Sequence, residues 1–377
     1  MTEGLQHLDP FGGAYRNRRV LVTGHTGFKG SWLTSWLLAL GADVCGVSKG
    51  LVSNPNAFSE ASLETHIAHH IVDVRDLEKL RAIIASFKPD FIFHMAAQAL
   101  VSRSYVDPLE TLTTNTIGTA NLLECLRSVE WPCSVVIVTS DKCYENVEWP
   151  WGYRETDHLG GRDIYSASKG AAEIVFHGFH QSFFRQTDCP VRLASSRAGN
   201  VIGGGDWAQD RIVADCIRAW TSGNVVQIRS PSATRPWQHV LEPLSGYLRL
   251  AEMLSRSPAM SGEQFNFGPR AEQNRTVVEI IGTLARHWGF LLEQEPFEVT
   301  ANVPFHEAGL LKLNCDKALL LLRWEPTLQL EECLHMTGDW YRRFYQEQRN
   351  ALELMDEQRS AYENLARERQ RAWAIGG

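Results

Sequence analysis

The sequence predicts an α/β fold in which helices cover both faces of a doubly wound parallel sheet. The first observation is a series of short apolar stretches, rich in β-branched residues, with the length of buried strands: 19–23, 43–48, 71–74, 91–95, 135–139 and 191–195. The second is that helix-like stretches lie between them: 31–40, 77–87, 109–129 and 167–185. Regular alternation of strand and helix is typical of a parallel sheet.

The first strand candidate runs directly into the glycine-rich segment Gly24-His-Thr-Gly27-Phe-Lys-Gly30. A strand, a glycine turn and a helix in this order let backbone N–H groups and a helix N-terminus hold a pyrophosphate. The spacing is GxxGxxG, not the GxGxxG of the common dinucleotide fingerprint, and such turns also serve simple packing. We expect the segment to bind a nucleotide cofactor through Gly24, Thr26, Gly27, Phe28, Lys29 and Gly30.

Three further segments fall at the carboxyl ends of strand candidates, where ligands bind in doubly wound sheets. The first two are expected to complete the cofactor site, through Asp73, Val74, Ala96, Ala97 and Gln98. The third is Ser140-Asp141-Lys142, which follows the stretch 135–139. Ordinary strand-end loops remain the alternative, but four such segments on one edge favour a ligand site.

Tyr165 and Lys169 form a YxxxK segment 25 residues after Ser140. If this segment is helical, the Lys169 ammonium lies beside the Tyr165 phenol, because residues four apart share a helix face. A free phenol has a pKa near 10, and a nearby cation favours the phenolate. We therefore expect Tyr165 to take the proton from an alcohol while a nicotinamide accepts hydride from the same carbon.

Composition excludes several other functions. The net charge of −7 argues against nucleic acid as a general partner. The eight cysteines show no CxxC or metal spacing, so we predict reduced thiols and no metal site. No segment reaches 18 uninterrupted apolar residues, and residues 1–17 lack the apolar core of a signal peptide. We expect a cytoplasmic protein without a membrane span.

With these motifs in view, the chain resembles the extended short-chain dehydrogenase/reductases over residues 18–345. Within that family it is similar to the nucleotide-sugar 4,6-dehydratases, most closely to the CDP-glucose branch. The stretch 138–146, VTSDKCYEN, carries much of this choice. The dTDP-glucose relatives have Thr-Asp-Glu in place of Ser140-Asp141-Lys142, and the 4-epimerases lack this pair of residues after the serine. Supporting stretches are 95–102, 115–119, 197–207 and 235–240.

The resemblance implies a lyase that converts CDP-D-glucose to CDP-4-dehydro-6-deoxy-D-glucose and water, in the synthesis of dideoxysugars and O-antigen-type polysaccharide precursors. Tyr165 would deprotonate O4 with the help of Ser140 as NAD takes hydride from C4, and Asp141 would protonate the departing 6-hydroxyl. Lys142 stands where the dTDP-specific enzymes have a glutamate base. A lysine is a base only if its pKa is strongly lowered, so the base for C5 stays open.

Two points of recognition are less direct. NAD-selective sites usually place an acidic residue at the end of the second strand, where this chain has Ser48-Lys49. Ser48 can hold a ribose hydroxyl, whereas Lys49 could accept the 2′-phosphate of NADP; the closed redox cycle favours NAD. The resemblance places the substrate at Ser102, Asn200, Arg211, Arg235, His306 and Glu307, with Trp207 and Trp237 as candidates for stacking on the base.

The domain organisation follows from the same resemblance: a Rossmann-like NAD-binding domain and a smaller C-terminal α/β lobe for the nucleotide sugar. The first comprises 18–201 and 223–259, with 225–229 and 240–254 returning to the sheet, and the second comprises 202–222 and 260–345. Residues 1–17 are expected to form a mobile tail and 346–377 a charged helix. The helices at 109–129 and 167–185 would pair across a two-fold axis as a four-helix bundle, giving a dimer, while further pairing of dimers into a tetramer stays open.

Two rival functions remain open at this point. One is another nucleotide-sugar enzyme of the same fold, either a 4,6-dehydratase for a different nucleotide or a 4-epimerase. The other, from a different class, is a catalytically silent NAD-binding protein with a regulatory role. The presence of Ser140, Tyr165 and Lys169 together favours an enzyme.

Overall fold

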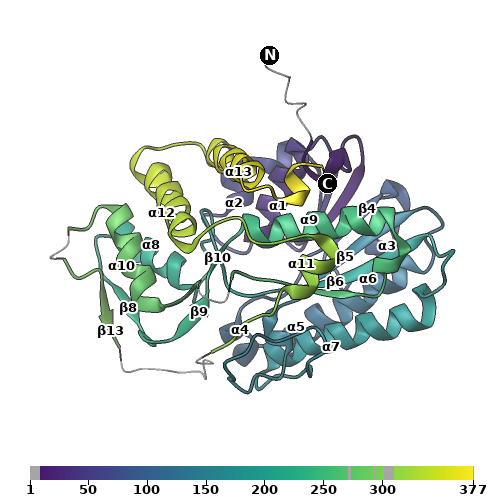
Figure 1. The fold of residues 1–377 in the computed structure, drawn as a ribbon, viewed down its shortest axis with the longest axis horizontal. Helices are drawn as coiled ribbons and strands as arrows, with labels where there is room; N and C mark the ends of the chain where they lie inside the picture. Colours follow the sequence, from purple (N-terminus) through teal and green to yellow (C-terminus); the bar gives the residue numbers. More distant parts are fainter. Residues whose placement is uncertain (1–8, 271–272, 292–293, 301–309, 377) are drawn as a thin grey trace, which may run out of the picture.

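The structure is a computed structural model that describes residues 9–270, 273–291, 294–300 and 310–376. Its centre is a seven-stranded sheet with the order β11-β6-β5-β4-β1-β2-β3, in which every neighbouring pair is parallel (Figure 1). The strands are β1 (Arg19–Thr23), β2 (Asp43–Ser48), β3 (Ala68–Ile71), β4 (Phe91–His94), β5 (Cys133–Val138), β6 (Val191–Ala198) and β11 (Gln264–Phe267). The predicted doubly wound sheet is confirmed.

Helices cover both faces of this sheet. Successive side chains of a strand point to opposite faces, so each strand contributes apolar residues to two separate cores, one between the sheet and each layer of helices. Val20 and Val22 of β1 pack with α1 (Phe28–Ala39) and α9 (Leu241–Arg256), whereas Leu21 packs with α3 (Leu77–Phe87) and α6 (Gly118–Leu126) on the other face. The second face also carries α4 (Val101–Val106), α5 (Pro108–Leu112) and α7 (Ile164–Phe179).

The predicted helices 109–129 and 167–185 each contain a π-helical stretch. Thr113–Ile117 joins α5 to α6, and His180–Phe184 continues α7. Asp163 begins α7, since its side chain accepts a hydrogen bond from the Ser166 N–H at 2.9 Å. The YxxxK segment is therefore helical, as predicted.

The third strand lies three residues earlier than predicted. Residues 68–71 pair with β2, with His69 opposite Gly46, while Asp73 and Val74 fall in the loop before α3. The predicted strand 71–74 leaves His69 and His70 ahead of the strand, but both lie in β3, and His69 Nδ1 lies 2.7 Å from His25 Nε2 in the glycine segment. A strand at the edge of a sheet can carry polar side chains. A prediction made from apolar residues therefore placed β3 three residues too late in the sequence.

A smaller lobe packs at one end of the sheet (Figure 1). It contains two short ribbons and the helices α8 (Ile212–Thr221), α10 (Val277–Trp288) and α12 (Leu330–Gln346). The ribbons pair β8 (Val226–Ile228) with β13 (Phe297–Val299) and β9 (Thr234–Pro236) with β12 (Asn274–Thr276). Short pieces complete the fold: α2 (Ala57–Glu60), α11 (Asp316–Leu322), and β7 (Val201–Ile202) paired with β10 (Gln238–His239).

Two segments differ from the expected division between domain and lobe. The stretch 225–229 was expected to return to the sheet, but β8 pairs with β13 in the lobe. Conversely β11, inside the 260–345 stretch expected in the lobe, is the seventh strand of the main sheet beside β6. Helix α9 does pack on the sheet, as expected for 240–254. Sequence alternation alone does not say which sheet a short strand joins.

Both ends of the described chain fold onto the body. Residues 9–17 belonged to the expected mobile tail, yet Phe11 and Tyr15 are buried, and the Tyr15 hydroxyl donates to the Leu248 carbonyl. The C-terminal segment forms α13 (Ala351–Glu368), which is separate from α12 and packs on α1. Beyond α13, Trp373 stacks on Phe11, which joins the two ends of the chain.

Candidate active site

The glycine segment between β1 and α1 is too tightly packed to accept larger residues. Gly24 has φ +74°, and a Cβ there would lie 2.7 Å from the Ala96 nitrogen. A Cβ on Gly30 would lie 2.2 Å from the Gly24 carbonyl oxygen. Helix α1 begins at Phe28, so its first N–H groups open onto the carboxyl edge of the sheet. This geometry fits the pyrophosphate of a dinucleotide.

The ends of β2 and β3 provide polar groups beside this turn. The Thr26 hydroxyl lies 2.6 Å from the Ser48 hydroxyl, at the place where an NAD-selective site usually has an acid. The Lys49 ammonium, which could have attracted a 2′-phosphate, forms an ion pair with Glu110 at 2.5 Å. Arg75 holds the Asp73 carboxylate at 2.7 Å and lowers the pKa of that carboxyl. This arrangement favours a free ribose over a phosphorylated one.

The loop after β4, which carries Ala96, Ala97 and Gln98, is fixed by a residue without a predicted role. Asn115 in the π-helical stretch accepts the Gln98 N–H at 2.8 Å and donates to the Gln98 carbonyl. Its amide also donates to the Ser168 hydroxyl of α7 at 2.8 Å. Asn115 thereby ties the cofactor loop to the helix that bears Tyr165; the only sequence signal was its place in the stretch 115–119.

Four of the five predicted catalytic residues lie in direct contact or on adjoining turns. Tyr165 interacts with Ser140, whose hydroxyl donates to the Asp141 carboxylate at 2.9 Å. The Lys169 ammonium lies 6.0 Å from the centre of the Tyr165 ring, one helical turn along α7. The fifth residue, Lys142, places its ammonium at the same distance from that ring. The YxxxK segment and the strand-end triplet therefore form one cluster.

The electrostatics of this cluster differ from the expectation in one respect. Burial raises the pKa of Tyr165 to about 12, although its interaction with Ser140 acts in the opposite direction. Burial also lowers the pKa of Lys169 to about 8. The prediction that Lys169 brings the phenol toward neutral pH is wrong for the protein alone, because loss of solvation outweighs a cation 6.0 Å from the ring.

Asp141 and Lys29 complete the buried charge of the site. Burial raises the pKa of the Asp141 carboxyl, against the attraction of Lys142 and Lys29. Burial lowers the pKa of Lys29 to about 7, helped by repulsion from Arg211 and Lys169. Lys29 therefore lies among the catalytic groups as well as at the start of α1. An Asp141 with a raised pKa is suited to donate a proton.

Of the predicted substrate residues, Arg211 and Asn200 lie near the catalytic cluster. Arg211, at the N-terminus of α8, interacts electrostatically with both Tyr165 and Lys29, so the lobe reaches the catalytic cluster. Asn200 follows Gly199, whose Cβ position lies 3.0 Å from an Asp141 oxygen. Ser102 is in α4, and Arg235 is in β9, where its guanidinium donates to the Thr234 carbonyl. His306 and Glu307 lie outside the described residues.

The two tryptophans proposed to stack on a base are packing residues instead. Trp207 is buried, donates to the Tyr345 hydroxyl at 2.9 Å and meets the ring of Trp340 edge-on. Trp237 is also buried and donates to the Arg275 carbonyl at 3.2 Å. Neither leaves a ring face for a ligand, and the twelve tryptophans of this chain gave no means of telling packing from recognition.

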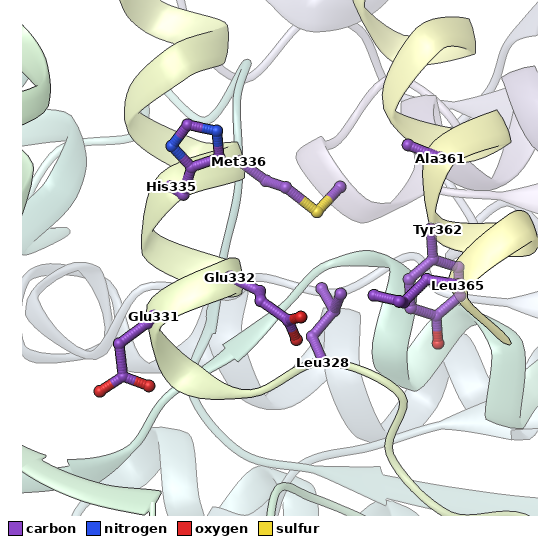
Figure 2. A pocket seen from close by; sticks show the side chains of 8 residues that line it. All are labelled: Leu328, Glu331, Glu332, His335, Met336, Ala361, Tyr362 and Leu365. Carbon is purple, nitrogen blue, oxygen red and sulfur yellow. The ribbon is translucent and has the colours of Figure 1, made fainter. Parts of the chain in front are cut away.

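A separate groove of about 400 Å³ lies where α12 and α13 meet, and it contains none of the predicted site residues (Figure 2). Two of its polar groups are already engaged: Glu332 pairs with Arg369 at 2.6 Å, and the Tyr362 hydroxyl donates to Glu242 at 2.9 Å. The groove is lined by Leu328, Glu331, Glu332, His335, Met336, Ala361, Tyr362 and Leu365. It is a seam between C-terminal helices and not the catalytic centre.

Comparison with known proteins agrees with this geometry. Residues 21–337 match the family described as GDP-mannose 4,6 dehydratase. The CDP-glucose 4,6-dehydratase of Salmonella typhimurium is 48% identical over 335 residues, which are 87% of this chain and 91% of that protein. A dTDP-glucose 4,6-dehydratase from Streptomyces venezuelae, solved with NAD and TYD bound, superposes with a TM-score of 0.74 at 22% identity, covering 86% of this chain and 97% of that one. The UDP-glucose 4-epimerase of Thermus thermophilus in complex with NAD has a TM-score of 0.72 at 25% identity, covering 86% and 99%.

Proposed function

The chain belongs to the GDP-mannose 4,6 dehydratase family, and from this premise we propose that it is a CDP-glucose 4,6-dehydratase that uses NAD. It converts CDP-D-glucose to CDP-4-dehydro-6-deoxy-D-glucose and water. The observation that carries the proposal is the contact of Tyr165, Ser140 and Asp141 in one buried cluster, in a chain 48% identical to an enzyme of that name.

The residues of this cluster divide the reaction between them. NAD, held at the turn that contains Gly24, Gly27 and Gly30, would supply a reversible acceptor for the hydride that leaves C4 and is restored at C6. Tyr165 takes the O4 proton, and Ser140 holds that oxygen in place, so that C4 becomes a ketone. The ketone acidifies the C5 proton, which passes to a base. Asp141, whose pKa burial raises, gives its proton to the 6-hydroxyl, which leaves as water.

Lys142 is our candidate for the C5 base. Its ammonium lies 6.0 Å from the Tyr165 ring and interacts with Asp141, so it lies near both groups that we assign to O4 and the 6-hydroxyl. The same base would return the proton to C5 as the hydride is restored to C6. The proton that Tyr165 takes from O4 must then pass to Asp141, which Ser140 links to the tyrosine, so that both groups are restored and the net change is the loss of one water. Because neither hydride nor proton leaves the site between steps, the cofactor must stay bound throughout.

The cationic side of the site is suited to an anionic nucleotide sugar. We assign the diphosphate to Arg235 and Arg211, with Asn200 and Ser102 beside the sugar, because guanidinium groups match phosphate oxygens. Arg211 is the better supported, through its interaction with Tyr165 and Lys29. The preference for cytidine is supported by the Salmonella relative alone. Turnover of CDP-, dTDP-, UDP- and GDP-glucose in one assay measures it.

The cofactor preference has its own test. The pairing of Lys49 with Glu110 and the Ser48 hydroxyl beside Thr26 support NAD. We expect protein stripped of cofactor to regain activity with NAD and not with NADP. Rescue by NADP alone would contradict this assignment.

Replacement of Tyr165 by phenylalanine tests the function directly. Loss of a general base costs roughly 10²- to 10⁴-fold, so turnover by Tyr165→Phe should fall by at least about a hundredfold while bound NAD is retained. Tyr345→Phe, which removes a hydroxyl on α12 that accepts from Trp207, is the matched control and should keep full activity. Product is followed by the loss of one water in mass spectrometry and by the ultraviolet absorbance of a 4-ketosugar in alkali.

The outcomes separate the rival functions. A product of unchanged mass with inverted C4 would make the protein a 4-epimerase, and inactivity on every nucleotide sugar would favour a silent NAD-binding protein. The presence of Asp141 in the cluster supports the dehydratase over the epimerase. A Tyr165→Phe variant as active as wild type would remove the tyrosine from the mechanism.

We propose that the protein is a homodimer formed through α5, α6, α7 and the π-helical stretches Thr113–Ile117 and His180–Phe184. These segments carry four exposed apolar side chains: Leu109, Ile117, Ile174 and Phe183. Pairing these helices across a two-fold axis would bury them in a four-helix bundle. Sedimentation equilibrium measures this oligomeric state, and a monomer at every concentration would contradict the proposal.

Three further expectations stay predictions: the pairing of dimers into tetramers, a place in O-antigen-type precursor synthesis and a cytoplasmic location. No helix within the described ranges is long and apolar enough to cross a membrane.

A further inference from the structure

A buried network of charged and hydroxyl groups lies directly beneath the catalytic cluster. Glu173, one helical turn after Lys169 on α7, forms an ion pair with Arg197 of β6 at 2.8 Å, and both side chains are almost fully buried. The Glu173 carboxylate also accepts hydrogen bonds from the Thr139 hydroxyl at 2.5 Å and from the Ser195 hydroxyl at 2.8 Å. Both carboxylate oxygens are therefore engaged by β5 and β6.

The network reaches the catalytic residues along two routes. Thr139 immediately precedes Ser140, so its bond to Glu173 fixes the end of β5 against α7. Tyr165, Lys169 and Glu173 occupy successive turns of α7, at positions four residues apart that share a face. The network thus joins the two segments that supply the catalytic groups.

Glu173 also places a negative charge close enough to interact with Lys169. Burial lowers the pKa of Lys169, whereas interactions with Cys143 and Glu173 raise it. The thiol of Cys143 stays protonated at neutral pH, because burial raises its own pKa well above the usual value. Arg197 and the two hydroxyls keep the pKa of Glu173 low, so its carboxylate is the permanent anion. The other groups facing Lys169 are Tyr165 on α7, His94 at the end of β4 and Lys29 on α1.

We propose that Glu173 is a positioning residue for the dehydratase reaction, whose carboxylate, held by Arg197, Thr139 and Ser195, keeps Lys169 charged beside Tyr165. This rests on the proposed function, since Lys169 is assigned there to the catalytic cluster. A buried lysine without the anion would lose its proton at lower pH, and the cation that faces the phenol would be lost with it. Arg197 stabilises the ionised form of the Glu173 carboxylate, which is buried away from water.

The test compares Glu173→Gln, which removes the charge at equal size, with Glu173→Asp, which keeps the charge but shortens the side chain. We expect the alkaline limb of the kcat–pH profile to move to lower pH by about one unit in Glu173→Gln, the smallest shift typical of losing a close opposite charge. In Glu173→Asp the limb should stay where it is in the wild type, whatever happens to the maximal rate. A merely structural role would lower the rate in both variants without moving the limb.

A second readout does not depend on activity. Without the anion, Lys169 resists protonation more strongly in the folded state, so Glu173→Gln should be least stable relative to wild type at low pH. The gap in Tm between the two cofactor-free proteins should narrow as pH rises from about 6 to 9, where Lys169 loses its charge in both. Over this range Glu173 itself does not titrate, since its pKa is held below the usual value.

Glu173→Gln leaves Arg197 buried without its anion, which can prevent folding. The double variant Glu173→Gln with Arg197→Met removes both charges and provides the second route. It should also move the alkaline limb to lower pH, because the Glu173 carboxylate is absent from this variant too.

An alkaline limb unmoved in both the single and the double variant would overturn the proposal. So would a limb that moves as far in Glu173→Asp as in Glu173→Gln, because charge would then not be the cause. Failure of the proposed function looks different: the wild-type protein itself would then release no 4-keto product from CDP-glucose, and no profile could be recorded.

Discussion

Replacing Gly30 by alanine should strongly weaken the binding of NAD. A Cβ at this position would lie 2.2 Å from the Gly24 carbonyl oxygen and 2.7 Å from the His25 Cα, both in the backbone of the preceding turn. Ordinary contact begins near 3.4 Å, so α1 and the turn must separate by about 1.2 Å (3.4 − 2.2). Because α1 carries the buried Trp32 and Trp36, the helix cannot retreat freely, and the turn must open instead.

The size of the effect follows from this displacement. Overpacking typically costs about 1–3 kcal/mol, and a clash between two backbone segments lies at the upper end. If relief comes from the turn that holds the pyrophosphate, about 3 kcal/mol corresponds to roughly a hundredfold weaker NAD binding. The NAD content of purified Gly30→Ala, and its Tm with and without added NAD, measure this loss.

Gly282→Ala is the matched control for the same chemical change. Gly282 lies inside α10, and the only atom that its Cβ would approach is Arg286 Nη1 at 3.9 Å. Alanine within a helix stabilises by roughly 0.5–1 kcal/mol relative to glycine, so this variant should retain NAD and a wild-type or higher Tm. A Gly30→Ala protein that keeps its full NAD content and stability would show that the turn is not the pyrophosphate site.

Two further substitutions test the site and the fold. Gly199→Ala places a Cβ 3.0 Å from an Asp141 oxygen, and a shift of a few tenths of an ångström in that carboxyl should lower kcat by roughly tenfold with NAD retained; unchanged kcat would show that Asp141 tolerates displacement. Trp373→Ala removes a fully buried ring stacked on Phe11 and Tyr362 and should cost about 3–5 kcal/mol in denaturant unfolding, whereas a loss below about 1 kcal/mol would mean that the C-terminus does not hold the body together.

The sheet was predictable wherever a strand is buried on both faces. β1 and β2 occupy the predicted residues, because β-branched apolar runs leave no other favourable place for these segments. At the sheet edge the same reasoning failed, and His69 and His70 lie inside β3. Helical spacing likewise predicted the contact between Tyr165 and Lys169, since it depends only on residues four apart.

Features that depend on contacts between distant residues could not be predicted. Residues 1–17 were expected to form a mobile tail, yet Gly12 and Gly13, with positive φ values of 58° and 69°, turn the chain so that Phe11 and Tyr15 enter the core. A glycine in the sequence is compatible both with a mobile segment and with an ordered turn, so the sequence alone does not distinguish the two. The same limit hid the partnership of Glu173 with Arg197, 24 residues apart in the sequence.

The raised pKa of Tyr165 has a consequence for how the enzyme begins its cycle. The Lys169 ammonium lies 6.0 Å from the ring, and with a pKa of about 8 it is not fully charged at slightly alkaline pH. Lys169 by itself therefore does not offset the effect of burial on the pKa of the phenol. The tyrosine consequently stays protonated beside Ser140 until further positive charge or a new hydrogen bond reaches it. An oxidised nicotinamide carries such a charge, whereas a reduced one does not. A bound oxidised nicotinamide would therefore favour the phenolate more than a reduced one would.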